Sequence, residues 1–255
     1  MTAVAKQSRA RGRTVAYPET DHMGEGLLQR LIMELLRPML ARFLAEAGKV
    51  ALVGADQFIY YREGDPACRI APDVYVLPGV PPGRRIRSWK TWQEGISPSF
   101  CFEVVSEDVR YDYEEKPILY SATGTNELVV FDPESEGQPG RYRWQVFRRL
   151  KSRGLIRVEV SQGDRIRSKE LGAWLREVGH GPDTRVLPAT GKYGDVLMLT
   201  PEQREERERV EKERERAEKE RERAEKETAE REVERLRTEL TALRSLPKPR
   251  RTKSR

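Results

Sequence analysis

Apolar residues between Gly24 and Ala47 recur at steps of three and four positions. This spacing places them on one face of an α-helix, so the segment is predicted to be an amphipathic helix. Pro38 lies inside the pattern and predicts a bend. Gly48 follows directly, and a glycine at this place is typical of a helix C-terminus. We therefore expect one long helix with a buried face near the start of the chain.

Short β-prone runs follow this helix, at residues 50–53, 57–62 and 74–77. The segment 78–83 contains three prolines and two glycines, which predicts a loop. Trp89 and Trp92 are expected in a further irregular stretch. Residues 99–106 form an almost continuous apolar run, the pattern of a strand buried on both faces. These runs predict the centre of a sheet.

The next segments alternate between helical and strand patterns. They are a helix over 111–123 that ends at Gly124, a strand over 127–132, a hairpin formed by 142–151 and 155–160, and an irregular region with short strands over 161–200. Pro117 must lie in the first turn of the helix, where its missing N–H is tolerated. The order of elements predicts an α/β fold with a mixed sheet and flanking helices.

The chain changes character after Thr200. Residues 201–246 carry 16 acidic and 14 basic side chains, and the heptad EKERERA occurs twice in succession from Glu211. Glutamate precedes lysine by four positions at Glu208, Glu215 and Glu222. Each such pair adds about 0.2–0.5 kcal/mol to a helix, so a long charged helix is predicted.

An apolar seam develops late in this helix. Its residues alternate steps of four and three: Ala229, Val233, Leu236, Leu240 and Leu243. Such a seam is typical of a coiled coil, although this one is only about two and a half heptads long. Two interpretations remain open. The helix is either solvated and alone, or it forms a homodimer or binds a partner protein through residues 229–246.

The formal net charge of +6 comes from the chain ends. Residues 1–15 contain four basic and no acidic side chains, and residues 247–255 contain five basic and no acidic ones. Both segments are predicted to be disordered. They either bind nucleic acid by neutralising phosphates or serve as solubilising ends.

Several classes of protein are disfavoured. Two cysteines, Cys68 and Cys101, make no disulfide framework, and two histidines, His22 and His180, are too few for a zinc site with them. A phosphate-binding glycine motif is missing from the sequence. No run of about 18 apolar residues predicts a membrane span, so a cytoplasmic protein is expected.

Three polar residues fall where the predicted core should be apolar. Asp73 begins the strand at 74–77, Glu103 lies inside the apolar strand 99–106, and Lys116 lies on the following helix. A buried glutamate is costly unless it is paired or binds a metal. Two carboxylates on adjacent strands form a hard-oxygen site suited to Mg²⁺ or Mn²⁺. A nearby lysine could then orient water for phosphodiester hydrolysis.

Each residue also has a structural explanation. Asp73 could be a turn residue that bonds its own backbone, since it follows a proline. Glu103 could form a purely structural salt bridge with Lys116, and Lys116 taken alone could be a solvated helix residue. These alternatives stay open at the level of single residues.

The joint pattern resembles the restriction endonuclease family called Uma two, a branch of the PD-(D/E)xK nuclease superfamily. The resemblance covers about residues 17–200. The matching residues are Pro72-Asp73-Val74, Ser88 to Gly95, Phe102 to Ser106, Asp112, Lys116 to Tyr120, Gly124, Glu127 and Asp132-Pro133. It implies a restriction-endonuclease-like domain over residues 16–200.

The resemblance also implies roles for single residues. Asp73 and Glu103 look like the metal-binding acids. Val105 stands where the superfamily has its lysine, and its backbone carbonyl would bind the metal. Lys116 looks like that lysine moved to the helix. Tyr120, one turn further, is expected to pack, with a hydrogen bond in the site as the alternative. The family also tends to place an acid of the site in the first helix, and either Glu25 or Glu34 is expected to be that residue.

This sequence departs from the family pattern in two places. Glu107 and Asp108 stand where the family has Pro-Ser, which adds two negative charges near the expected phosphate site. The strand from Glu127 also lacks an aromatic pair that is common in the family.

The sequence thus supports two hypotheses from different classes. The first is a Mg²⁺-dependent endodeoxyribonuclease that holds DNA with Arg84, Arg85 and Arg87. The second is a catalytically weak or inactive nuclease-fold module that recruits partners through its C-terminal helix. Binding of a divalent cation discriminates between them.

Overall fold

The structure is a computed structural model that describes residues 26–245, with side chains described as far as Ala242. The expectations for residues 1–15 and 247–255, and those for His22 and Glu25, lie outside the described residues. The chain divides into two compact units, Met1–Met198 and Leu199–Arg255.

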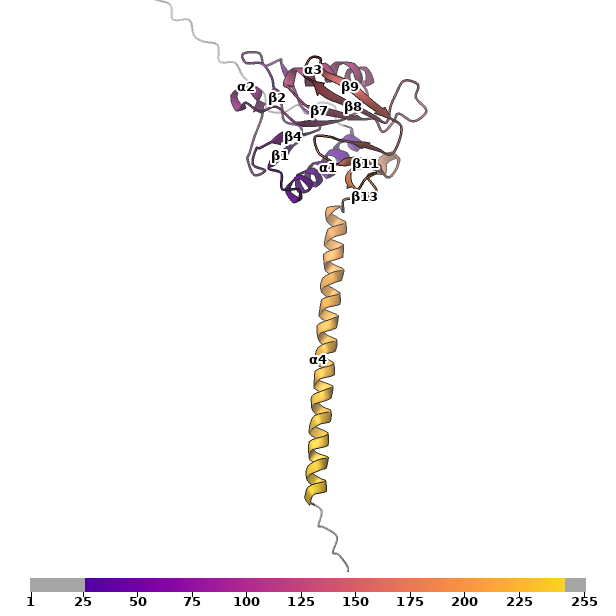
Figure 1. Ribbon diagram of the computed structural model, residues 1–255. Coiled ribbons are helices and arrows are strands. Elements are labelled where there is room, and N and C mark those ends of the chain that lie inside the picture. Colours follow the sequence, from indigo (N-terminus) through magenta and orange to yellow (C-terminus); the bar gives the residue numbers. More distant parts are fainter. Residues whose placement is uncertain (1–25, 246–255) are drawn as a thin grey trace, which may run out of the picture. The chain divides into compact units, whose positions relative to one another are not determined.

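The described residues of the first unit form helices and three sheets, and Figure 1 shows their arrangement. Its helices and strands in chain order are α1 (Leu27–Glu46), β1 (Ala51–Gly54), β2 (Ile59–Tyr60), β3 (Arg69–Ile70), β4 (Val74–Pro78), β5 (Trp89–Lys90), α2 (Thr91–Glu94), β6 (Phe100–Val104), a π-helical turn (Tyr111–Glu115), α3 (Lys116–Thr123), β7 (Glu127–Phe131), β8 (Trp144–Leu150), β9 (Gly154–Ser161), β10 (Arg165–Arg167), β11 (Trp174–Val178), a 3-10 turn (Gly181–Asp183), β12 (Arg185–Thr190) and β13 (Val196–Leu197).

The predicted first helix is confirmed as α1. Its buried face includes Ile32, Leu36, Leu40 and Leu44, which follow the expected four-residue step. The helix continues through Pro38. Gly48 then takes a left-handed conformation with φ of 69°, as expected for a residue that ends a helix.

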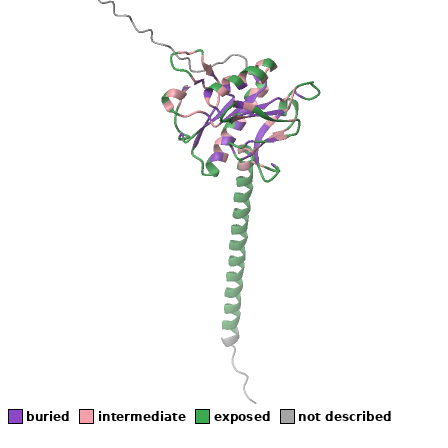
Figure 2. Ribbon diagram, turned by 45° about the horizontal axis from the view of Figure 1, so that its top comes forward, coloured by how far each residue is buried: buried purple, intermediate pink, exposed green. Residues whose placement is uncertain are grey.

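The largest sheet has six strands in the order β1-β4-β6-β7-β8-β9. Only β6 and β7 in this sheet run parallel to each other, and the remaining neighbours are antiparallel. Every residue of β6 is buried, as the continuous apolar run predicted. Figure 2 shows the buried strands enclosed by exposed loops and helix faces. The predicted mixed α/β fold is confirmed.

Alternate residues of β6 point to two different parts of the core. Phe100, Phe102 and Val104 belong to the cluster that contains the buried face of α1. Cys101 belongs to the opposite cluster with Tyr120 of α3. Because strand side chains alternate between faces, Glu103 points to the α3 side of the sheet. This places a carboxylate in an otherwise apolar layer.

Two segments expected to be irregular are ordered. Trp89 lies in β5, which pairs in parallel with β2, and Trp92 lies in the short helix α2. Trp89 is fully buried, and its indole N–H donates to the carbonyl of Ile96 at 2.8 Å. Residues 161–200 contain an antiparallel four-stranded sheet, β10-β11-β12-β13. Short strands were predicted in this region, but their pairing into one sheet was not, because the strands are short and separated by glycine turns.

The second unit is dominated by one helix, α4 (Pro201–Ser245). Every one of its side chains from Glu205 to Ala242 is exposed, as the green ribbon in Figure 2 shows. The predicted charged helix is therefore confirmed, whereas a coiled coil stays a prediction. Among the described residues, no helix has the length and apolar character needed to cross a membrane.

Candidate active site at the end of strands β4 and β6

Asp73 completes the hydrogen bonding between β4 and β6. Its Oδ2 accepts from the backbone N–H of Val104 at 2.6 Å, and its Oδ1 accepts from the amide of Gln29 on α1 at 2.7 Å. The carbonyl of Pro72, the next residue back, accepts instead from the N–H of Asp56. The carboxylate thus bonds to a neighbouring strand and not to a turn of its own backbone. Asp73 is 4% exposed.

Glu103 lies on β6 opposite this position. Val74 pairs with Phe102, so one further step of the antiparallel register sets Asp73 against Glu103. Glu103 is fully buried, and its Oε2 accepts from the ammonium group of Lys116 at 2.5 Å. The structure therefore brings together the three residues on which the sequence argument depended.

Lys116 also contacts a second acid. Its ammonium group lies 2.7 Å from Oδ1 of Asp112, four residues earlier. The other oxygen of Asp112 accepts from the backbone N–H and the hydroxyl of Ser106, at 2.7 and 2.8 Å. Asp112 is fully buried, and the Lys116 side chain is 14% exposed. One cation thus serves two buried carboxylates.

A π-helical turn positions these residues. The predicted single helix over 111–123 begins with a π-helical turn, in which the N–H of Lys116 bonds the carbonyl of Tyr111, five residues back. Pro117 then begins α3, where its missing N–H is harmless. Such wide turns are rare and occur mostly at functional sites. Here the turn places Asp112 and Lys116 on the side that faces Glu103.

Tyr120 both packs and bonds within the site, so the alternative that the sequence left open, a hydrogen bond in the site, is the one that the structure has. It is fully buried in the core on the α3 side, and its hydroxyl donates to Oε1 of Glu103. Both oxygens of Glu103 therefore have a donor from the same helix. These two donors fix the orientation of the carboxylate.

The electrostatics of the cluster favour an additional cation. Burial raises the pKa of Asp73 well above its usual range, and the charge of Glu103 raises it further, while Lys116 opposes both effects. Burial likewise raises the pKa of Glu103, again against Lys116. Although burial acts to lower the pKa of Lys116, the three surrounding acids raise it overall. Lys116 is therefore charged, and the acids share a single compensating charge.

Val105, the expected carbonyl ligand, lies at the end of the parallel pairing between β6 and β7. Its N–H donates to the carbonyl of Phe131. In a parallel ladder the carbonyl of Val105 would accept from residue 133, which is a proline without an N–H. Strand β7 therefore cannot supply the usual donor to this oxygen.

Two residues that contact the site were given no role from the sequence, and one residue that was proposed for the site lies outside it. Gln29 and Asp112 contact the site residues directly, but only Asp112 had a signal, through the family resemblance. Glu34 is exposed on α1, away from Gln29, and does not join the site. Within residues 26–245, no group of three or more histidine, cysteine, aspartate or glutamate side chains is arranged to hold a metal ion.

The two added acids, Glu107 and Asp108, are both exposed. Asp108 caps the helical segment that follows, because its Oδ1 accepts from the N–H of Tyr111 at 3.0 Å. A charge at this helix start is favourable. The departure from the family pattern thus has a structural role outside the buried cluster.

Four arginines line a groove beside β1, the edge strand of the large sheet. Arg84, Arg85 and Arg87 come from the loop before β5, and Arg37 from α1 joins them. Arg84 forms a bidentate pair with Glu94, at 2.9 and 2.6 Å. Arg37 gave no signal in the sequence, because it is one of several exposed charged residues on α1. The groove is strongly basic.

One comparison with known proteins identifies the family of this chain. A search of curated proteins found no match. Among solved structures, a protein from Anabaena variabilis described as a putative nuclease belonging to DUF820 has a TM-score of 0.38 and 15% sequence identity, over 64% of this chain and 81% of that one. Residues 6–179 match the Uma2 (Uma two) family, described as putative restriction endonuclease. This match spans more than half of the chain, and the chain therefore belongs to the Uma2 family.

Proposed function

We propose that this protein is a metal-dependent endonuclease that hydrolyses phosphodiester bonds of DNA. The observation that carries the proposal is the pair of buried carboxylates, Asp73 and Glu103, set against each other at the ends of neighbouring strands beside one ammonium group. Membership of a family described as restriction endonucleases supports the same reaction class. A cytoplasmic location belongs to the proposal, because Cys68 and Cys101 are free thiols.

The donor set fits Mg²⁺ or Mn²⁺. Asp73, Glu103 and the carbonyl of Val105 would supply oxygen ligands, which these hard cations prefer, and water would complete the coordination. When bound, the cation would polarise a phosphoryl oxygen and lower the pKa of a bound water. Its charge would also balance the acids that now share Lys116.

The surrounding side chains would hold the acids in place. Gln29 and the Val104 N–H fix Asp73, and Tyr120 fixes Glu103. Lys116 uses two of its three N–H groups on Glu103 and Asp112. Its third N–H could orient the attacking water or donate to a phosphate oxygen, because the side chain is partly exposed.

The arginine groove would hold the DNA backbone. Arg37, Arg84, Arg85 and Arg87 would neutralise phosphates, a type of contact that carries no sequence information. Replacing Arg85 with glutamine should therefore weaken binding of all DNA sequences and reduce the salt dependence of binding.

The test combines cleavage with metal binding. Purified protein should cut DNA with Mg²⁺ or Mn²⁺, and both Glu103→Gln and Asp73→Asn should lose this activity by at least about 100-fold, the order expected for a group that holds the reacting centre. Calorimetry with Mn²⁺ should give a binding signal that Asp73→Asn abolishes. The matched control is Glu107→Gln, which removes an exposed acid nearby and should change neither measurement.

A second candidate is an inactive nuclease-fold module that recruits partners. It is favoured by the hydrogen bonds that both oxygens of Glu103 accept from Lys116 and Tyr120. The two proposals separate in the Mn²⁺ titration. Absence of any heat signal, together with uncut DNA, would leave only the module.

A further inference from the structure

The described part of α4 leaves a row of large apolar side chains in solvent. Val233, Leu236 and Leu240 are 48%, 49% and 51% exposed. With Ala229 they occupy one face at alternating steps of four and three. Most of the remaining side chains of the helix are charged. Leucine side chains arranged in this way gain free energy when a second helix covers them.

We propose that this face pairs with the same face of a second copy of the chain, in parallel and in register. In heptad terms, Val233 and Leu240 occupy position a, and Ala229 and Leu236 occupy position d. A β-branched residue at a with leucine at d favours two parallel strands. The proposal concerns α4 alone and does not depend on the nuclease assignment.

The charges beside the seam select this orientation. Glu232 occupies position g and Arg237 occupies position e of the next heptad. In a parallel pair, each Glu232 faces Arg237 of the partner subunit, and symmetry makes this contact twice. In an antiparallel pair, position g faces position g, so Glu232 would meet Glu232 of the partner subunit. The helix is thus complementary to itself only when both copies run the same way.

The side chains of Glu232 and Arg237 can exchange their ion-pair partners within the helix for partners on a second helix. Glu232 now pairs with Arg235 at 2.7 Å, and Arg237 pairs with Glu234 at 4.0 Å, in both cases within the helix. All four side chains are more than half exposed. Exposed pairs of this kind contribute little stability, so giving them up for contacts between helices costs little.

The same register explains where the pairing begins. Before Ala229 it places Lys212, Lys219 and Lys226 at position a, and glutamates at position d. A parallel pair would bring lysine against lysine and glutamate against glutamate, which is unfavourable. The paired segment is therefore limited to residues 229–245, and the preceding heptads remain solvated.

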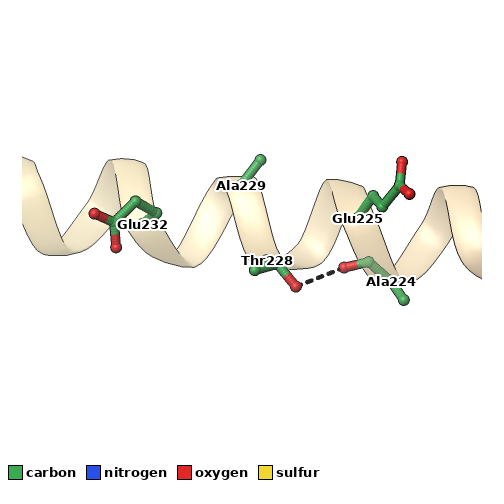
Figure 3. Close-up of a pocket in the computed structure, with 5 residues that line it drawn as sticks. All are labelled: Ala224, Glu225, Thr228, Ala229 and Glu232. Atoms are coloured by element: carbon green, nitrogen blue, oxygen red, sulfur yellow. Dashed lines mark hydrogen bonds between the residues drawn. The ribbon is translucent and has the colours of Figure 1, made fainter.

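The surface of α4 has only a shallow depression at the start of the paired segment. Figure 3 shows a depression lined by Ala224, Glu225, Thr228, Ala229 and Glu232, all from α4. Thr228 turns its hydroxyl onto the carbonyl of Ala224 at 2.8 Å, which leaves mainly small groups at the surface. A single helix cannot enclose a small ligand there. Small side chains do permit a second helix to approach closely at Ala229.

The experiment is sedimentation equilibrium of the full-length chain over a concentration series. The wild-type chain should show a reversible monomer–dimer equilibrium. Glu232→Arg or Arg237→Glu alone converts two attractive contacts into two repulsive ones and should raise the dissociation constant about tenfold. The double variant Glu232→Arg with Arg237→Glu exchanges the two charges and should restore the wild-type value.

Glu234→Arg is the control, because it makes the same change of charge at position b, which faces away from the seam. It should leave the dissociation constant unchanged. A chain that sediments as a monomer at every concentration would overturn the proposal. So would single charge reversals that have no more effect than Glu234→Arg, or a double variant that fails to recover.

Discussion

The buried site and the helix α4 use charged side chains in opposite ways. The site holds three acids and one lysine, and none of the acids is more than 4% exposed. Helix α4 carries many more charges, but in a representative pair, Glu215 and Lys219, the side chains are 63% and 74% exposed. Coulomb interactions are strong in the interior and screened in water. A few charges therefore determine the behaviour of the site, whereas the stability of α4 is the sum of many weak contacts.

The largest effect is expected from Lys116→Met in the site. This change removes the cation that faces Glu103 and Asp112 and leaves buried acids without an opposite charge. Breaking a buried pair in this way costs about 3–5 kcal/mol of unfolding free energy near neutral pH. Urea denaturation of the metal-free protein measures it. A loss below about 1 kcal/mol would mean that water screens the cluster and would remove the contrast with α4.

A smaller effect of opposite sign is expected from Glu103→Gln. Burial raises the pKa of Glu103 in the folded protein, so folding is penalised as the pH rises above the unfolded pKa of about 4.3 and Glu103 ionises. Glutamine keeps the volume and carries no charge. The metal-free variant should be more stable than wild type by about 1 kcal/mol at pH 7, in the usual range for relieving a functional site.

This gain should disappear at about pH 3, because Glu103 is protonated in both states well below its unfolded pKa of about 4.3. Denaturation curves at the two pH values test the sign. A variant that is less stable than wild type at pH 7 would show that Glu103 is a structural partner of Lys116, the alternative that the sequence left open.

The smallest effect is expected from Glu215→Gln on α4. The change removes one of many exposed pairs, and Lys219 keeps its hydration. The helix should lose about 0.2–0.5 kcal/mol, and less at high salt. Circular dichroism at low and high ionic strength measures this loss. A change as large as that of Lys116→Met would show that these charges are coupled after all.

The sequence predicted the main site residues because their chemistry conflicts with their surroundings. Glu103 interrupts an apolar strand, and Asp73 and Lys116 are also polar where the predicted core should be apolar; the family resemblance then implied their roles. Gln29 could not be found in this way, because its contact with Asp73 joins residues 44 positions apart. For Tyr120 the sequence left packing and a hydrogen bond both open, because a tyrosine on a buried helix face gives no sign of where its hydroxyl points.

The same limit applies to the fold. The helix α1 and the strand β6 follow from regular patterns of apolar residues, and both were predicted. The sheet of β10 to β13 was not, because strands of two to six residues show too few alternations to be recognised. The π-helical turn before Pro117 also has no periodic signal, since it shifts the pattern by only one residue.

The contact between Asp73 and the Val104 N–H has a consequence for the sheet itself. Where the backbone of Pro72 leaves the ladder, a side chain takes the position of a carbonyl. The last rung of β4 therefore depends on a group that can gain a proton or attract a cation. Fraying of this strand end, and with it hydrogen exchange at Val104, should respond to the charge at the centre of the site.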